Sequence, residues 1–257
     1  MRYYIRLSYN GSAFSGWQIQ PDGITVQGCL QKALSLVSGE DVAVTGAGRT
    51  DAGVNAVNYV AHFDVEEPLP LRPEDLEYKI NAILGKEIIV HEVAPVSDDL
   101  HARFSAVSRE YKYFLHRKKD PFMGHFSWYC KYGLDVDAMN EAAAFLKGTY
   151  DFSCFEKKGG NNKTSVCTVL ESGWRSYTPS HVKELGYPAA DGDYLVFTVR
   201  ADRFLRNMVR AIVGSLVDVG RGKRDPEWLR SLIGSGSRSD AGESVPGHAL
   251  FLSDIEY

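Results

Sequence analysis

The stretch GAGRTDAGVN, residues 46–55, places one arginine and one aspartate among three glycines. Such a loop could cradle a phosphate group, or it could present a carboxylate for chemistry. The dinucleotide-binding fingerprint G-x-G-x-x-G opens a helix, whereas the glycines here stand at 46, 48 and 53 and a strand-like segment follows. A Walker A loop would need Gly-Lys-Ser or Gly-Lys-Thr, which this stretch lacks. The stretch therefore favours a sharp connection that points Arg49 and Asp51 out of a sheet, although a plain aspartate turn would have the same composition. Glycines at 46, 48 and 53 are expected because such a turn often needs φ values that only glycine reaches at little cost.

Regular segments on both sides of the loop must hold it in place. Alternating apolar residues predict strands, and apolar residues three or four positions apart predict helices. The predicted strands are residues 2–9, 41–45, 57–65, 87–93, 105–117, 126–132, 164–175, 193–201 and 249–257, and the predicted helices are residues 25–37, 73–84, 137–146, 205–219 and 226–233. This order favours an α+β fold of two similar α/β halves, 1–104 and 105–257, with mostly antiparallel sheets flanked by helices and an active-site cleft between the halves.

Length and composition limit the class of protein. A chain of 257 residues with 44% hydrophobic content can bury a substantial core in one large or two small domains. Its first residues alternate instead of forming an apolar leader, and no stretch approaches the roughly 20 apolar residues of a membrane span. We therefore expect a soluble, cytoplasmic protein without a membrane partner. Cys29, Cys130, Cys154 and Cys167 form no C-x-x-C pair, so packed, reduced thiols and no metal site are expected.

The charges are segregated along the chain. The net charge is -4, yet residues 101–119 hold six Lys or Arg against one acidic residue, and residues 200–224 hold seven against two. These two basic segments stand out against an acidic remainder, which is typical of a protein that binds nucleic acid. The alternative is that both are ordinary solvated faces opposite acidic neighbours.

The run AGRTDAGVNAVNYVAHFDV resembles the signature of the tRNA pseudouridine synthase A (TruA) family. Five further stretches follow in that family's order, namely YNGSAFSGWQIQP, HARFSAVSREYKY, DFSCF, FLRNMVRAIVGSLVDVGRGK and PGHALFLSDIEY. The resemblance covers nearly the whole chain. Each stretch alone is a weak signal, but their common order argues strongly against chance.

The resemblance implies roles for five residues. Asp51 corresponds to the catalytic carboxylate, and Arg210 corresponds to its basic partner. Tyr111 matches the tyrosine that lies against the target uracil. Arg49 matches the arginine that helps to flip or hold the target nucleotide, and Leu250 matches an apolar residue that lines the pocket beneath the base. The first half would then carry the aspartate loop, and the second half the substrate tyrosine and the basic helix.

The reaction implied by the resemblance is the isomerisation of uridine to pseudouridine at positions 38 to 40 of the tRNA anticodon arm. The bond from N1 to C1′ breaks and a bond from C5 to C1′ forms, so no cofactor is required. A carboxylate such as Asp51 could attack the ribose, attack the base, or remove a proton, and the residues leave these routes open. An arginine beside it favours its ionised form. The resemblance also implies a homodimer in which one tRNA spans both subunits.

Several positions carry a weaker or mixed signal. The family usually has His where this chain has Asn55, and G-H-D-F where this chain has G-T-Y-D-F at residues 148–152, which include Tyr150. Trp17 could contact RNA or cap an edge of the core, and His62 is expected to be structural. The polar loop 156–164 could close on RNA or have no role, while the loop 177–193 carries no functional signal.

Two other classes of protein stay open. A glycosidase also uses an aspartate at an anomeric carbon, but most need a second carboxylate as acid, and the loop around Asp51 offers none. An RNA-binding module with an inactive site would explain the basic segments but would leave Asp51 without a task. Formation of pseudouridine in tRNA without release of free uracil distinguishes the three.

Overall fold

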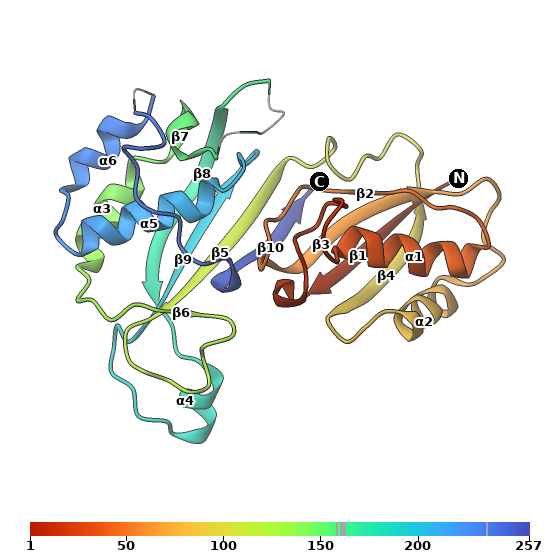
Figure 1. The fold of residues 1–257 in the computed structure, drawn as a ribbon, viewed down its shortest axis with the longest axis horizontal. Helices are drawn as coiled ribbons and strands as arrows, with labels where there is room; N and C mark the ends of the chain where they lie inside the picture. Colours follow the sequence, from red (N-terminus) through yellow and green to blue (C-terminus); the bar gives the residue numbers. More distant parts are fainter. Residues whose placement is uncertain (158, 160–162, 235) are drawn as a thin grey trace. The chain divides into compact units, whose positions relative to one another are not determined.

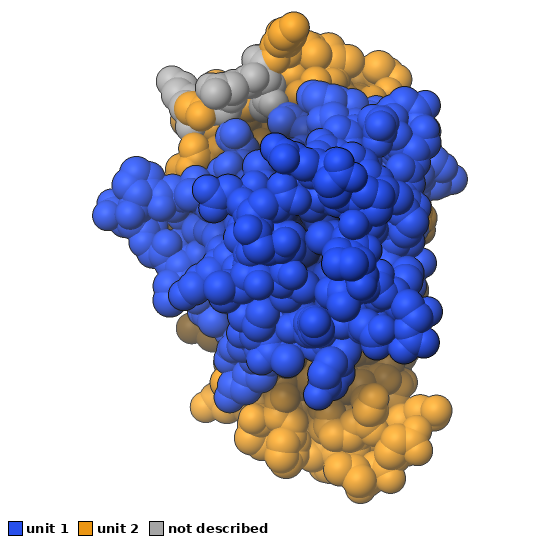
Figure 2. All heavy atoms as spheres, turned by 90° about the vertical axis from the view of Figure 1, so that its right-hand side faces the viewer, with its two compact units in different colours: residues 1–109, 251–257 blue, residues 110–250 orange. Residues whose placement is uncertain are grey.

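The structure is a computed structural model that describes residues 1–157, 159, 163–234 and 236–257. Its Cα positions group into two compact units, coloured separately in Figure 2: residues 1–109 with 251–257 form unit 1, and residues 110–250 form unit 2. The units are defined by spatial proximity, and they assign 105–109 and 251–257 to the first part of the molecule. The predicted functional halves, 1–104 and 105–257, remain a prediction.

Unit 1 contains a sheet in the order β4-β1-β3-β10, with β2 paired to β3. Strand β1 runs antiparallel to both β3 and β4, with Leu7 opposite Tyr59, whereas β10 pairs with β3 in parallel. The bounds are β1 Arg2–Tyr9, β2 Val44–Gly46, β3 Asn55–Asp64, β4 Ile88–Val96 and β10 Leu250–Glu256, of which Leu250 alone belongs to unit 2.

Helices α1 (Val26–Ser38) and α2 (Pro73–Ile83) lie side by side in unit 1 (Figure 1). The Thr25 side chain caps α1 by accepting from the Gly28 N–H, and Pro73 starts α2 at the position where a missing N–H costs nothing. Helix α1 buries Val26, Leu30, Ala33 and Leu34, which share one face at the predicted helical spacing. Helix α2 packs against β4.

Strand β3 departs from a simple two-faced pattern. Tyr59, Ala61 and Phe63 are buried as the alternation predicts, but His62 on the opposite face is buried too. Val57, predicted to share the buried face, is 45% exposed. The strand that follows the aspartate loop is therefore covered on both faces over most of its length, which gives the loop a rigid support.

Unit 2 contains strands in the order β5-β9-β8-β7, with the short β6 paired to β5. Helices α3, α5 and α6 pack together in Figure 1, and α3 also packs against β8. The strands are β5 Ser108–His116, β6 Trp128–Tyr129, β7 Gly148–Asp151, β8 Val166–Ser176 and β9 Tyr194–Ala201, and the helices are α3 Val136–Ala144, α4 Ser180–Leu185, α5 Met208–Gly220 and α6 Pro226–Leu232. Short 3-10 turns span Gly11–Ala13, Ser153–Phe155 and Gly247–Ala249.

The predicted α+β class, with mostly antiparallel strands and flanking helices, is confirmed, and the corrections are local. Strand β2 is shorter than predicted, most of 126–132 is not strand, and β7 was missed. The helix predicted at 205–219 starts at Met208, because Asn207 adopts a left-handed conformation with φ 64° that interrupts it. Helix α4 lies in the segment predicted as a loop, between Pro179 and Gly186.

The cysteines are packed thiols, as predicted. Cys130, Cys154 and Cys167 are buried and Cys29 is half-buried, and none forms a disulfide. Burial raises the pKa of Cys154 to about 12, so its thiol stays protonated and unreactive at neutral pH. Across the described ranges, no helix is both long enough and apolar enough to span a bilayer.

Candidate active site

The Asp51 loop, residues 46–55, connects β2 to β3 in unit 1. The Val54 N–H donates to the Asp51 carbonyl at 3.1 Å, which closes a tight turn directly after the catalytic candidate. Arg49 is exposed and Asp51 is half-buried. The loop thus presents an acidic and a basic side chain two residues apart, as predicted, at the end of a short strand.

The three glycines of the loop have different structural reasons. Gly53 has φ 78°, a conformation that glycine reaches at little cost, as predicted. Gly46 has an ordinary φ, but a Cβ atom there would lie 2.2 Å from the Tyr59 Oη and 2.5 Å from the Trp17 ring. Gly48 has neither a positive φ nor a close neighbour, so the prediction that the three glycines are needed for their φ values is confirmed for Gly53 and wrong for Gly46 and Gly48.

Backbone contacts hold the loop on both sides of Asp51. The Trp17 N–H donates to the Thr50 carbonyl at 3.1 Å, and the Gly53 N–H donates to the Phe14 carbonyl at 3.4 Å. Gly16, with φ 103°, lets this neighbouring segment approach, since a Cβ there would lie 2.6 Å from the Thr50 carbonyl oxygen. The backbone that carries the Asp51 carboxylate is therefore fixed before substrate arrives, which favours catalysis by a preorganised group.

Beneath the loop lies an aromatic cluster of Tyr9, Trp17 and Tyr59, each at most 4% exposed. The Trp17 and Tyr59 ring centroids are 4.1 Å apart, and those of Tyr9 and Tyr59 are 5.6 Å apart. Trp17 therefore caps the core instead of facing RNA. The Tyr9 hydroxyl is 2.9 Å from the Thr50 Oγ1. The Tyr59 hydroxyl donates to the Gly48 carbonyl and accepts from the Gly48 N–H at 3.3 Å.

We expect Tyr59→Phe to lower kcat by roughly tenfold or more, because the loop loses the hydroxyl that holds both polar groups of Gly48. Tyr3→Phe is the matched control: Tyr3 is 6% exposed, stacks on Phe63 and accepts from the Leu69 N–H at 3.2 Å, away from the loop. Both variants should lose about 1–2 kcal/mol of unfolding free energy. Denaturant unfolding and steady-state kinetics on both variants test this, and an equal kcat in the two would show that Tyr59 does not position the loop.

Asn55, where the resembling family usually has His, is only 2% exposed. Its Oδ1 accepts from the Gly11 N–H at 2.8 Å. Gly11 itself packs tightly there, since a Cβ would lie 2.1 Å from the Val54 carbonyl oxygen. Asn55 thus connects the end of the Asp51 loop to the segment after β1 through a buried hydrogen bond. Asparagine in place of the family's usual histidine therefore has a structural role.

Arg210 lies in the first turn of α5, in unit 2, and is half-buried. Its Nε donates to the Val245 carbonyl at 2.7 Å, and its own carbonyl accepts from the Val245 N–H at 3.2 Å. A cation near a helix N-terminus is unfavourable by itself, and the contact with the Val245 carbonyl offsets part of this cost. Arg206, four residues before Arg210, precedes the helix and is exposed.

Tyr111 and Leu250 also belong to unit 2. The half-buried Tyr111 ring lies edge-on to Phe204 with centroids 5.0 Å apart, whereas Tyr113 is fully buried and donates its hydroxyl to the Pro246 carbonyl at 3.1 Å. Leu250 is 4% exposed and starts β10. Tyr113 is therefore a core residue, while Tyr111 is only half-buried. Arg49 and Asp51 stand in unit 1, and their meeting with Tyr111, Arg210 and Leu250 remains a proposal.

Some of the predicted basic charge is already paired within unit 2. Lys112 and Arg200 bind Glu110 at 3.0 and 3.1 Å, and Lys223 binds Asp218 at 3.1 Å. The Arg221 guanidinium lies 3.5 Å from the Tyr132 ring centroid. Only part of each basic segment is therefore available for phosphate groups. The loop 156–164 falls partly outside the described residues, so its predicted closure on RNA stays a prediction.

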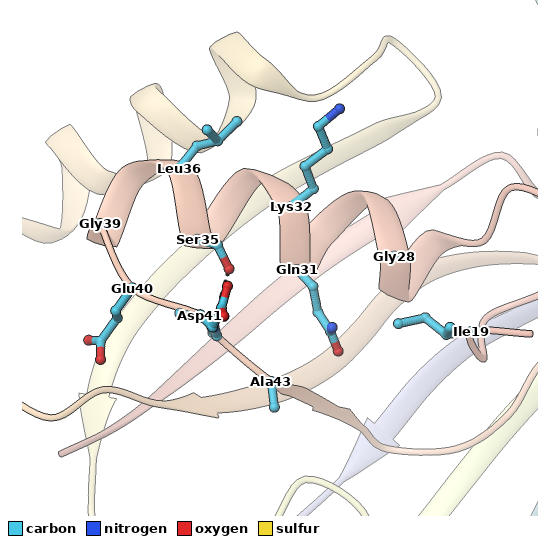
Figure 3. Close-up of a pocket in the computed structure, with 11 residues that line it drawn as sticks. Ile19, Gly28, Gln31, Lys32, Ser35, Leu36, Gly39, Glu40, Asp41 and Ala43 are labelled. Carbon is cyan, nitrogen blue, oxygen red and sulfur yellow. Dashed lines mark hydrogen bonds between the residues drawn. The ribbon is translucent and has the colours of Figure 1, made fainter.

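An open groove of unit 1 lies between α1 and residues 39–43, and none of the five predicted site residues lines it (Figure 3). Gln31 and Ser35 point toward this segment, where the Ser35 Oγ accepts from the Val42 N–H at 2.9 Å and the Gln31 Oε1 accepts from the Val44 N–H at 3.1 Å. These side chains hold the chain against the helix, so we interpret the groove as structural. Within the described ranges, no group of three His, Cys, Asp or Glu side chains could hold a metal ion.

Comparison with known proteins adds independent information to this geometry. A family profile described as tRNA pseudouridine synthase matches residues 7–105 and 142–257. The protein named tRNA pseudouridine synthase A from Parabacteroides distasonis is 47% identical over 259 residues, which covers 100% of this chain and 96% of that protein. The protein of the same name from Bacillus subtilis is 38% identical over 261 residues, covering 100% of this chain and 99% of its own length. Both alignments run through the Asp51 loop and the Arg210 helix.

Proposed function

Because the chain belongs to the tRNA pseudouridine synthase family, we propose that it isomerises uridine to pseudouridine in tRNA with Asp51 as the catalytic carboxylate. The observation that carries the role of Asp51 is its loop. The turn after Asp51, the backbone contacts of Thr50 and Gly53, and the Tyr59 hydroxyl all fix the chain that bears this one carboxylate. A plain surface turn needs no such support.

The proposed roles follow from the chemistry of each side chain. Asp51 acts as nucleophile or base while the bond from uracil N1 to C1′ breaks and the bond from C5 to C1′ forms, after which C5 loses its proton. In this proposal Arg210 is the basic partner that keeps the carboxylate ionised. A uridine stacked in RNA hides these atoms, so Arg49 holds the flipped nucleotide, and Tyr111 and Leu250 bracket its base.

We further propose that the substrate uridines lie at positions 38 to 40 of the anticodon arm and that the enzyme acts as a homodimer. The two basic segments supply phosphate contacts through the part of their charge that is not already paired. No metal or cofactor has a role in this proposal, since the reaction exchanges one bond to C1′ for another within the same nucleotide.

The experiment that tests this function is incubation of the protein with unmodified tRNA, followed by nucleoside analysis. We expect pseudouridine in the anticodon arm and no free uracil. Free uracil would identify a glycosidase instead. Binding of tRNA without any new nucleoside would identify an RNA-binding module with an inactive site.

We expect the affinity for tRNA to fall steeply with salt, because contacts between phosphates and Lys or Arg release counterions. A plot of log affinity against log salt should have a slope of about −3 or steeper, which roughly four phosphate contacts produce. Arg72→Gln is the control: Arg72 is exposed, is paired with Asp75 at 2.9 Å and lies outside both basic segments, so this change should leave the slope unaltered. A flat dependence in the wild type would contradict the role of the basic segments.

A further inference from the structure

Phe104 is 76% exposed at the surface of unit 1, in the segment 101–107 that precedes β5. It belongs to none of the contacts described for the Asp51 loop. Exposing a phenyl ring to water forgoes about 1.5–3 kcal/mol of burial, although a single exposed apolar side chain is common at protein surfaces. Its surroundings decide whether it is an incidental surface residue or a built feature.

The segment is closed by its own polar groups. The His101 N–H donates to the Ser105 Oγ at 2.9 Å, and the Ser105 N–H donates to the His101 carbonyl at 2.9 Å. The His101 Nδ1 accepts from the Arg103 N–H at 3.1 Å and from the Phe104 N–H at 3.2 Å. The backbone that carries Phe104 is thus tied to one imidazole ring.

Ring contacts connect this imidazole to the interior. The His101 ring centroid lies 4.4 Å from that of Phe104, with the rings tilted, and 4.7 Å from that of His62, with the rings edge-on. His62 is 4% exposed and accepts from the Ala102 N–H at 3.1 Å through Nδ1. Burial lowers the pKa of His62 to about 4, so the ring stays neutral at neutral pH, as its acceptor role toward the Ala102 N–H requires. The Tyr257 hydroxyl donates to the Ala102 carbonyl at 2.7 Å.

Arg109 joins the segment to the Asp51 loop. Its Nη1 donates to the Ala106 carbonyl at 2.9 Å, and its Nη2 donates both to the Arg103 carbonyl and to the Ala47 carbonyl, the latter at 3.2 Å. Ala47 opens the loop that carries Asp51. The exposed ring is therefore held in a fixed relation to the catalytic candidate within the same unit.

The charge beside the ring identifies the class of ligand. The exposed Arg103 guanidinium lies over the Phe104 ring, 5.6 Å from its centroid. The His101 ring also contacts the Phe104 ring, with the centroids 4.4 Å apart. An aromatic face flanked by a guanidinium suits a nucleotide, whose base stacks on the ring while its phosphate binds the cation. A protein interface would need about 800 Å² of contact per partner, mostly apolar at its centre. In the segment 101–107, Val107 is the other exposed large apolar residue, and it stands beside the exposed Arg103 and Ser105.

We propose that Phe104 is a stacking site for an unpaired RNA base other than the target uridine, with Arg103 bound to an adjacent phosphate. The inference rests on the proposed function, since it assigns a second contact point on the same RNA. The proposal also explains the hydrogen bonds that hold the segment 101–107, because an aromatic ring selects one position of a base only when its backbone is rigid.

The test compares Phe104→Ala, Arg103→Gln and a matched control in tRNA binding over a range of salt concentrations. Phe104→Ala should weaken binding roughly 5- to 150-fold at every salt concentration and leave the slope unchanged, because stacking releases no counterions. Arg103→Gln should reduce the slope by about 0.7–0.9. The control is Tyr78→Ala on α2, which removes an aromatic ring of the same 76% exposure beside acidic residues and should leave affinity unaltered.

A second variant, Phe104→Trp, supplies a fluorophore at the site. Binding of tRNA should quench its emission beyond the change seen in the wild type. Unaltered affinity in Phe104→Ala would overturn the proposal, and so would dissociation of an oligomer by that variant in sedimentation, which would assign the ring to a subunit interface. These outcomes leave pseudouridine formation by the wild type intact, so they are distinct from a failure of the proposed function, in which the wild type makes no pseudouridine.

Discussion

Asp51→Asn should form no detectable pseudouridine, a loss of at least about 1000-fold, while folding and tRNA binding are retained. Asparagine keeps the size and the carbonyl oxygen of aspartate but has no charge and no ability to attack or to accept a proton. The contacts that hold the backbone on both sides of residue 51 include those of the Thr50, Gly53 and Val54 main-chain atoms, which the change leaves in place. Nucleoside analysis, thermal unfolding and a tRNA binding assay measure the three properties separately.

Asp41→Asn is the matched control for this variant. Asp41 is exposed in the same unit, ten residues before Asp51, and the change removes the same charge. It should keep wild-type turnover. If Asp41→Asn and Asp51→Asn lost activity equally, a general effect of charge would explain the result and the assignment of Asp51 would fail.

Tyr111→Ala should lower kcat/KM by roughly 5- to 150-fold, because the flipped base loses the aromatic face on which it stacks. Tyr111→Phe keeps that face and should retain RNA binding. The partly accessible ring beside Phe204 predicts a smaller loss of stability than for a core tyrosine. Steady-state kinetics with both variants separates stacking from any role of the hydroxyl.

The neighbouring Tyr113 provides the comparison. Tyr113 is fully buried, so Tyr113→Ala should lower the free energy of unfolding by about 3–5 kcal/mol, as truncation of a core aromatic does. Compared with Tyr113→Ala, Tyr111→Ala should lower the free energy of unfolding less and should lower the activity of each folded molecule more. Turnover of Tyr111→Ala equal to that of the wild type would assign Tyr111 to the scaffold instead of the substrate site.

Much of the fold was predictable because its signals are local. Strand β1 has the predicted bounds, and α1 and α2 start within one residue of theirs, since Thr25 and Pro73 mark helix starts directly in the sequence. Helix α4 was missed because its flanking proline and glycine indicate a loop. The interruption at Asn207 was missed because nothing in the apolar stripe of α5 reveals a left-handed residue before it.

The residues proposed for the site could be named from the sequence, but the contacts that hold the Asp51 loop could not. Asp51 stands out through its glycine-rich surroundings and through the resemblance. Tyr59 has the alternation of any core residue, and only the fold shows that its hydroxyl reaches back across the turn to Gly48. Arg109 likewise looked like one more charge of a basic segment, whereas its guanidinium is used to join Ala47 to the segment 101–107. Such contacts depend on chain reversals that no local pattern encodes.

The most direct test of the account is tritium release from tRNA labelled at C5 of uridine, measured in parallel for the wild type and Asp51→Asn. The new bond to C1′ replaces the hydrogen at C5, so release reports the chemical step itself. We expect the wild type to release tritium in proportion to the pseudouridine formed, and Asp51→Asn to match the background without enzyme. Release near the wild-type rate by folded Asp51→Asn would show that the catalytic carboxylate lies elsewhere and that the loop of residues 46–55 is only a turn.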